Sequence, residues 1–311
     1  MGPRIRSSIT GIASLFLVTI VLAGCSGPAS VPAESPSSPG PSASATADVS
    51  GLIDIGGGRS LFLECRGTGS PTVLLVSGTR GAADEWMTLL PDAAPDAIST
   101  FDALAESTRV CAYDRPGTTI ESGEPTASTV VPQPTTARQS AEDLHTLMAA
   151  ADQPEPYVVV GLSWGGMIAQ QFARSYAGEV DGIVLLDSAS AYLQETFAPE
   201  QWTAWMSIVA GSGDAAGSEV PSYEPSIAEL RASPDLPAIP GVVVSSDQPW
   251  DLQVTPGAST WPGWVAAQAL LADSLDATHV TETESGHGLS VEQPALVTDA
   301  ILSVVDTVRA G

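Results

Sequence analysis

The stretch from residue 157 to residue 173 constrains this chain more than any other part of it. Four strand-forming residues lead into a Gly-x-Ser-x-Gly pattern at 161–165, and helix-compatible residues follow at once. A strand, a sharp turn and a helix in this order lift the hydroxyl of the central serine clear of a sheet. Backbone N–H groups at the start of the helix can then stabilise a developing negative charge. The stretch therefore predicts that Ser163 is a nucleophile.

Apolar runs and helical segments alternate along the chain around this stretch. The expected strands cover residues 52–55, 59–65, 72–76, 109–114, 182–187, 241–245 and 277–283. The expected helices cover residues 135–151, 264–275 and 295–308. This alternation predicts an α/β fold, in which helices cover both faces of a mostly parallel sheet.

The first 25 residues have the pattern of an export signal. Arg4 and Arg6 precede a short apolar run at 12–22, and Leu-Ala-Gly-Cys follows, ending at Cys25. This ending resembles the lipobox of bacterial lipoproteins, which implies lipidation of Cys25 and a location on the outer face of the cell membrane. An uncleaved membrane anchor is the alternative, but the run is short for a span of about 20 residues.

Residues 26–47 consist almost wholly of Ser, Pro, Ala, Gly and Thr, a composition expected of a solvated tether. We therefore expect a single folded domain at 48–311. The net charge of the whole chain is −25, which excludes nucleic acid as an expected partner because phosphates require a basic surface.

Several short motifs occur in a specific order along the expected domain. They are Ser77-Gly78, Tyr113-Asp114-Arg115-Pro116-Gly117, the serine motif at 161–165, and Ser285-Gly286-His287 followed by Glu292-Gln293-Pro294. In these motifs the chain from about Leu52 to Arg309 resembles the α/β-hydrolases. The resemblance implies a mostly parallel sheet of about eight strands, with an insert at 190–238 in the place of that family's lid.

A serine nucleophile needs a general base, and the chain contains three histidines. His145 falls in the middle of an expected helix, and His279 at the start of an expected strand. His287 lies in a glycine-flanked loop just after the last strand, at the edge where the serine turn also emerges. The chain order of serine, acid and histidine also fits this fold. We therefore predict His287 as the base.

The acid that orients the histidine is left open by the sequence. Asp187 ends the strand after the serine helix, and Asp247 follows the next strand. The resemblance allows either position, because both are used in different branches of the family. Asp251 is a weaker third candidate.

The resemblance also implies an oxyanion hole formed by the backbone N–H groups of Trp164 and Thr79. Ser77 stands where the family often has histidine, but the expected donors belong to the backbone. The family's second and fourth strands are neighbours, which implies that Cys65 and Cys111 lie side by side. In an exported protein we expect these two to form a disulfide. No metal site and no cofactor are expected.

We expect an extracytoplasmic hydrolase of small uncharged carboxylic esters. The insert carries large apolar residues that favour modest acyl groups over long lipid chains: Tyr192, Phe197, Trp202, Trp205 and Met206. A proline-iminopeptidase-like aminopeptidase is one alternative, and a haloperoxidase-like enzyme or a non-catalytic binding lipoprotein are others. Acidic residues that could hold a substrate amine in the aminopeptidase are Glu195, Glu200, Asp214, Glu219 and Glu224.

Overall fold

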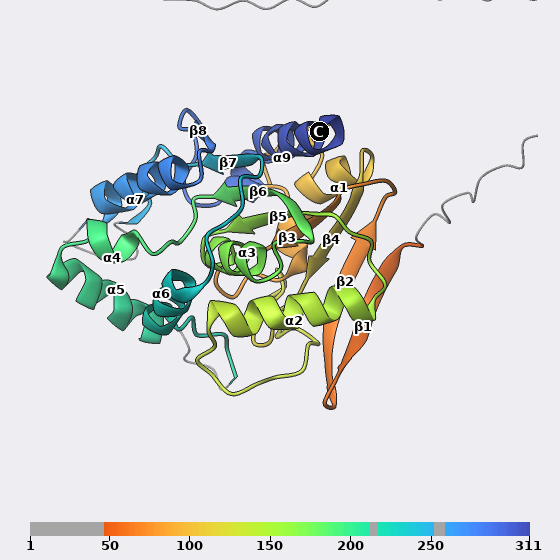
Figure 1. Cartoon of the computed structure of the whole chain (residues 1–311), viewed down its shortest axis with the longest axis horizontal. Helices are drawn as coiled ribbons and strands as arrows, with labels where there is room; N and C mark the ends of the chain where they lie inside the picture. Colours follow the sequence, from red (N-terminus) through yellow and green to blue (C-terminus); the bar gives the residue numbers. More distant parts are fainter. Residues whose placement is uncertain (1–46, 212–216, 252–258) are drawn as a thin grey trace, which may run out of the picture. The chain divides into compact units, whose positions relative to one another are not determined.

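The computed structural model describes residues 47–211, 217–251 and 259–311. Its eight strands form one sheet (Figure 1). They are β1 (Val49–Gly56), β2 (Arg59–Arg66), β3 (Thr72–Val76), β4 (Arg109–Tyr113), β5 (Tyr157–Leu162), β6 (Val180–Leu186), β7 (Gly241–Val244) and β8 (Thr278–Val280). The predicted export signal and nearly all of the predicted tether lie outside the described residues.

The strand order is β1-β2-β4-β3-β5-β6-β7-β8. The β1–β2 and β2–β4 pairs are antiparallel, and the remaining pairs are parallel. The parallel strands therefore end at a common edge, where the loops that follow β3, β5, β6 and β7 gather. The predicted fold class of a mostly parallel sheet of about eight strands is confirmed.

Helices cover both faces of this sheet (Figure 1). The helices are η1 (Ala83–Trp86), α1 (Thr100–Ala105), α2 (Ala137–Ala150), α3 (Trp164–Ser175), α4 (Leu193–Thr196), α5 (Pro199–Gly211), α6 (Tyr223–Ala232), α7 (Trp261–Ser274), α8 (Leu289–Glu292) and α9 (Pro294–Ala310). Side chains of α2, α3 and α7 form the core on one face, and those of η1, α1 and α9 form it on the other. No helix among the described residues is long and apolar enough to cross a membrane.

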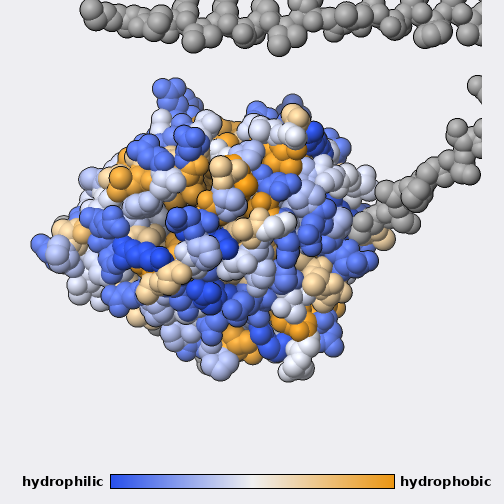
Figure 2. Space-filling view, viewed as in Figure 1, coloured by the Kyte–Doolittle hydropathy of each residue, from blue (hydrophilic) through white to orange (hydrophobic). Residues whose placement is uncertain are grey.

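The central strands supply alternate residues to the two cores. In β3, Val73 and Leu75 pack on the α1–α9 side, while Leu74 and Val76 pack on the α2–α3 side. All five residues of β3 are buried, which explains why its sequence is continuously apolar. One face of the molecule is mainly polar, with apolar residues gathered between α7 and α9 (Figure 2).

Several expected elements have slightly different bounds in the structure, and two of the differences have a clear local cause. Helix α2 begins at Ala137 because Thr136 accepts a hydrogen bond from the Gln139 backbone N–H and forms a capping box. Strand β8 ends at Val280 rather than at residue 283. The N–H groups of residues 283–285 donate to the Asp247 carboxylate, so they are not available to extend the strand.

A buried arginine anchors the beginning of the domain. Arg109, the first residue of β4, is 1% exposed. Its guanidinium donates to the carbonyl oxygens of Ala47 (2.8 Å) and Gly67 (3.1 Å) and to the Gln153 side chain (3.0 Å). Arg109 thereby ties residue 47 to the edge of the sheet where the parallel strands begin.

Residues 190–238, called the insert below, run between β6 and β7 and contain α4, α5 and α6. The segment that returns from α5 is bound to the body of the domain by backbone hydrogen bonds. Thr135 N donates to Val220 O (3.1 Å), and Ser222 N donates to Thr135 O (2.9 Å). The part of the insert at 217–222 is therefore fixed against the loop that leads into α2.

Candidate active site

Ser163 forms the tight turn between β5 and α3. Its backbone angles are φ 53° and ψ −120°, a conformation that L-residues rarely adopt. Three hydrogen bonds hold it: Ser163 N donates to Leu186 O (3.0 Å), and Ser163 O accepts from Gly166 N (3.0 Å) and Ala189 N (2.9 Å). The strain at Ser163 is therefore stabilised by β6 and the loop that follows it.

The glycines around Ser163 are required by close backbone approach. A Cβ atom on Gly165 would lie 2.1 Å from the carbonyl oxygen of Val76, and one on Gly161 would lie 2.4 Å from the carbonyl oxygen of Gly165. A side chain at either position would push α3 away from β3 or β5. The Gly-x-Ser-x-Gly pattern thus reflects packing of the turn against the sheet.

His287 contacts Asp187 and not Asp247. His287 Nδ1 lies 2.6 Å from Asp187 Oδ2, and the Asp187 side chain is completely buried whereas that of His287 is 31% exposed. Asp187 also has a left-handed backbone, with φ 38°. Its other oxygen accepts from the Ser246 backbone N–H at 3.2 Å. The contact fixes the imidazole ring and satisfies Nδ1, leaving Nε2 as its second ring nitrogen.

Asp247 lies on the surface and caps the loop that precedes His287. Its carboxylate accepts from the backbone N–H groups of Glu284 (3.0 Å), Ser285 (3.0 Å) and Thr283 (3.1 Å). These hydrogen bonds, that from Glu284 foremost, lower the pKa of Asp247. Asp251, the third candidate, accepts from Thr260 N and Trp261 N at the start of α7. The structure thus gives all three aspartates defined but different partners.

Two tryptophans and a glutamate surround His287. The Trp250 ring stacks on the imidazole, with centroids 4.1 Å apart, and the Trp264 ring meets it edge-on at 5.6 Å. Glu292 accepts from Gly286 N (2.7 Å) and Gly288 N (3.3 Å), the residues on either side of the histidine. In the sequence Glu292 stands out only as part of a motif, and no pattern marks Trp250.

The other two histidines lie elsewhere. His145 stacks on Tyr176 (3.8 Å between centroids) and faces Glu179 on the outside of α2. His279 Nε2 lies 2.7 Å from Ser245 Oγ, and burial lowers the pKa of His279.

Ser163 and His287 line one cavity of about 350 Å³. The loop after β3 contributes Gly78, Thr79, Arg80 and, from η1, Glu85. The remaining walls are largely apolar and aromatic: Leu162, Trp205, Ile208, Val209, Tyr223, Trp250 and Gly288. Because Trp205, Ile208, Val209 and Tyr223 belong to the insert, the insert forms much of the wall opposite the sheet.

The loop after β3 passes directly beside the nucleophile. A Cβ atom on Gly78 would lie 3.5 Å from Ser163 Cβ, and Thr79 follows on the cavity wall. Ser77 tightens this loop, because its hydroxyl donates to Ala82 O (2.8 Å) and accepts from Trp86 Nε1 (2.9 Å). Trp164 begins α3, so its backbone N–H belongs to the unpaired first turn of that helix.

Glu85 places a carboxyl group on the cavity wall, and no sequence motif indicates this position. Its Oε2 accepts from Gly78 N at 3.2 Å. Burial raises the pKa of Glu85, and the hydrogen bond from Gly78 and the charge of Arg115 oppose that rise.

Three of the five acidic residues considered for amine binding have side-chain partners in the structure. Glu195 pairs with Arg231 at 2.9 Å, Glu224 accepts from Trp202 Nε1 at 3.3 Å, and Glu219 pairs with Arg115 at 2.6 Å. Glu200 is exposed in the first turn of α5, and Asp214 lies outside the described residues. Of the described ones, none lines the cavity.

Cys65 and Cys111 form a disulfide between β2 and β4, where the two residues are direct partners in the strand register. The expected pairing therefore holds in the structure.

Comparisons with known proteins agree with this architecture. A family model described as alpha/beta hydrolase fold matches residues 71–217. An esterase from Thermogutta terrifontis superposes with a TM-score of 0.54 at 20% identity, over 84% of this chain and 99% of that one. The fold is that of the α/β-hydrolases.

Curated relatives match this chain over shorter stretches. The proline iminopeptidase PfmaB of Pestalotiopsis fici is 26% identical, over 46% of each chain. A putative carbamate hydrolase, RutD of Yersinia enterocolitica, is 31% identical, over 41% of each chain. The matches span between 26% and 47% of the length of such relatives.

Proposed function

We propose that this protein is a serine hydrolase that cleaves small, uncharged carboxylic esters, with Ser163, His287 and Asp187 as its catalytic residues. One observation carries the proposal. The strained Ser163 and a histidine held at Nδ1 by a buried aspartate line the same cavity. Strain, burial and a fixed imidazole together are expected of an activated serine.

In the proposed reaction, His287 Nε2 removes the proton from Ser163 Oγ as this oxygen attacks the ester carbonyl. The negative charge moves to the carbonyl oxygen, where the N–H groups of Thr79 and Trp164 stabilise it. The imidazolium, oriented and stabilised by Asp187, returns the proton to the departing alcohol. A water molecule, deprotonated by His287, then attacks the acyl carbon. His287 returns this proton to Ser163 Oγ as the acyl–serine bond breaks, and the carboxylic acid leaves.

The cavity supports a substrate of modest size. Its volume of about 350 Å³ lies near the lower end of the range of roughly 300–1,000 Å³ typical of ligand sites. Aromatic and aliphatic walls favour an uncharged acyl group. The net charge of −25 disfavours anionic esters through long-range repulsion.

One observation favours a second candidate, an aminopeptidase, besides the similarity to a proline iminopeptidase. Such an enzyme needs a carboxylate for the substrate amine, and Glu85 is the one carboxylate on the cavity wall among the described residues. However, burial raises the pKa of Glu85 and thus favours its neutral form, which weakens its attraction for an ammonium group.

A single substrate panel tests both candidates. It contains p-nitrophenyl acetate, hexanoate and palmitate, together with prolyl- and alanyl-p-nitroanilides. We expect the two short esters to give the highest kcat/KM, and Ser163→Ala to lower it by a factor on the order of 10⁴ or more. If the amides are cleaved tenfold better than the esters, the esterase proposal is wrong. If Ser163→Ala keeps half of the wild-type activity, both candidates are excluded.

We also propose that the enzyme acts outside the cytoplasm as a lipoprotein anchored at Cys25. The sequence of the first 25 residues supports this, and so does the Cys65–Cys111 disulfide, because such bonds persist in oxidising compartments. Cys25→Ser is expected to move the protein from the membrane fraction to the medium. Retention in the membrane fraction would identify the apolar segment itself as the anchor.

A further inference from the structure

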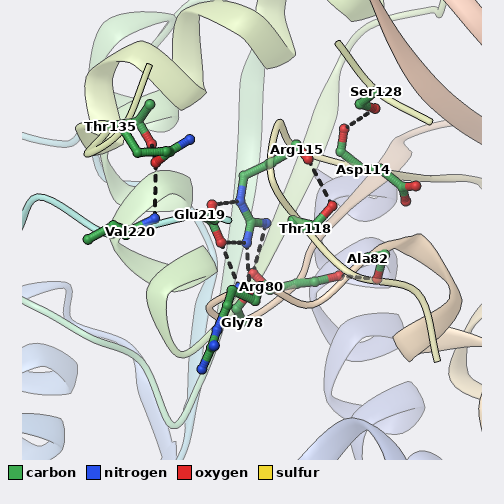
Figure 3. Close-up of polar contacts among 12 residues, drawn as sticks. Gly78, Arg80, Ala82, Asp114, Arg115, Thr118, Ser128, Thr135, Glu219 and Val220 are labelled. Atoms are coloured by element: carbon green, nitrogen blue, oxygen red, sulfur yellow. Dashed lines mark hydrogen bonds and ion pairs between the residues drawn. The ribbon is translucent and has the colours of Figure 1, made fainter. Parts of the chain in front are cut away.

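A buried ion pair joins the insert to the loop after β4 (Figure 3). Arg115 Nε donates to Glu219 Oε1 at 2.6 Å, and Arg115 Nη2 donates to Glu219 Oε2 at 2.9 Å. Both side chains are 1% exposed. Arg115 belongs to the loop after β4, whereas Glu219 belongs to the insert, 104 residues later. The pair therefore joins the insert, which forms part of the cavity wall, to the loop after β4.

The same two side chains also bind the backbone on both sides of Thr79. Arg115 donates to Ser77 O (3.0 Å) and to Gly78 O (2.6 Å). Glu219 Oε2 accepts from the backbone N–H of Arg80 at 2.6 Å. In Figure 3 the guanidinium and the carboxylate lie together against this loop. The residues before and after Thr79 are thus held by one ion pair.

The residue after Thr79 has an uncommon conformation. Arg80 has φ 62°, in the left-handed region. Its N–H is bound by Glu219, and its carbonyl accepts from Thr119 N at 2.8 Å. The orientation of the peptide group between Gly78 and Thr79, and hence the direction of the Thr79 N–H, depends on this turn being maintained.

The insert approaches the Arg115 loop closely at this point. Glu219 N donates to Gly117 O at 2.9 Å, and a Cβ atom on Gly117 would lie 2.5 Å from Gly217 O. A buried ion pair in such a place contributes little net stability, because desolvation offsets much of the attraction between the charges. Its hydrogen bonds to the loop after β3 indicate a positional role instead.

We propose that Glu219 is a positioning residue that, with Arg115, holds the Thr79 N–H toward the substrate carbonyl oxygen and makes this alignment depend on the seating of the insert. The inference rests on the serine hydrolase function proposed above. It also assigns Glu219 to the alignment of the oxyanion hole, in place of the amine recognition that an aminopeptidase would require.

Glu219→Gln tests the inference. In the wild type, three N–H groups donate to the two carboxylate oxygens of Glu219. Glutamine keeps the size of the side chain but has only one acceptor oxygen. We expect kcat per active site to fall by about 10- to 100-fold, because small misplacements of catalytic groups cause losses of this size. KM should stay within about twofold of the wild-type value. Active sites are counted by end-point labelling with a fluorophosphonate, which removes any effect of unfolded protein. The Ki of an alkylboronic acid, whose oxygen occupies the oxyanion hole, should rise by a similar factor.

Gln133→Ala is the matched control. Gln133 Oε1 accepts from Val220 N at 3.0 Å, so this change loosens the residue next to Glu219 without touching residues 77–80. We expect kcat and the boronate Ki of this variant to stay within about twofold of the wild type. If Glu219→Gln does not fold, Arg115→Met/Glu219→Met removes both charges together and is expected to show the same loss.

Two results would overturn the inference. One is an unchanged kcat per active site and boronate Ki in Glu219→Gln, or in the double variant if that is the one measured. The other is an equal loss in Glu219→Gln and Gln133→Ala, which would reflect general seating of the insert. With either result, the serine hydrolase proposal still holds as long as the wild type turns over substrate and this turnover depends on Ser163. If wild-type turnover is absent or independent of Ser163, that proposal fails, and the positioning role falls with it.

Discussion

Asp187 and Asp247 follow neighbouring strands of one sheet, yet their surroundings differ in every respect that governs chemistry. Asp187 is fully buried, has a left-handed backbone and contacts His287. Asp247 is exposed, and its carboxylate binds three backbone N–H groups of the loop before His287. Asp187 thus contacts the imidazole ring itself, whereas Asp247 binds the backbone of the loop that carries His287.

The difference arises from how the chain leaves each strand. Asp187 comes directly after β6, and its N–H still donates to Val244 O of β7 at 2.7 Å. It therefore stays beneath the end of β7, where Ser246 N reaches its carboxylate. Asp247 comes three residues after β7 and has already turned toward solvent. Ser246 thus contacts Asp187, whereas the next residue, Asp247, contacts the loop before His287. Position along the chain alone does not distinguish the two aspartates.

The largest effect is expected from Asp187→Asn. An amide in this place cannot stabilise the imidazolium and favours the wrong tautomer of His287, so we expect kcat to fall by about 10³- to 10⁴-fold. Steady-state kinetics with p-nitrophenyl acetate measures this, and circular dichroism checks that the variant is folded. A loss below tenfold would end the assignment of Asp187 as the acid.

An intermediate effect is expected from Glu292→Gln. Glu292 accepts from the N–H groups of Gly286 and Gly288, so the change loosens the backbone on both sides of His287. We expect kcat to fall by about 3- to 10-fold, since the imidazole keeps its contact with Asp187. Asp299→Asn, at an exposed position of α9, is the matched control and should leave kcat unchanged. Equal values for the two variants would contradict a role for Glu292 in holding the loop.

The smallest effect on activity is expected from Asp247→Asn, with kcat within about threefold of the wild type. Its effect on stability should depend on pH. The folded-state pKa of Asp247 is lowered, chiefly by the hydrogen bond from Glu284, so its stabilisation is complete above the unfolded pKa of about 4. That stabilisation is lost as the pH falls through the folded-state pKa.

Urea unfolding of Asp247→Asn and the wild type at several pH values measures this effect. At neutral pH we expect the variant to lose about 1 kcal/mol in free energy of unfolding, comparable to the loss of a helix cap. The difference should vanish in acid. A hundredfold loss of kcat would instead make Asp247 the catalytic acid and reverse the comparison.

Much of the architecture is predictable because it depends on local patterns. Continuous apolar runs indicated the buried parallel strands, and the glycines around Ser163 indicated the turn. His287 could be selected because its loop follows the last strand. Cys65 and Cys111 followed from the strand order implied by the family resemblance.

The contacts that the sequence could not predict depend on backbone conformation or on long-range packing. Neither the left-handed φ of Asp187 nor its burial is encoded in a motif, so Asp187 and Asp247 looked equivalent. The Arg115–Glu219 pair joins residues 104 positions apart, and no sequence motif indicates a partner for Glu219. Trp250 approaches His287 from the loop after β7, and no periodic pattern indicates that stacking contact.

The hydrogen bond from Arg109 to the carbonyl oxygen of Ala47 has a mechanical consequence. Arg109 lies at the edge where the parallel strands begin, whereas Ser163 and His287 lie at the edge where they end. A load applied to the chain at residue 47 would pass into β1, which follows directly, and through Arg109 to the start of β4, which the disulfide at Cys111 also joins to β2. If the proposed anchor at Cys25 is correct, a pull on it would reach this edge of the sheet first, whereas the loops that carry Ser163 and His287 lie at the opposite edge.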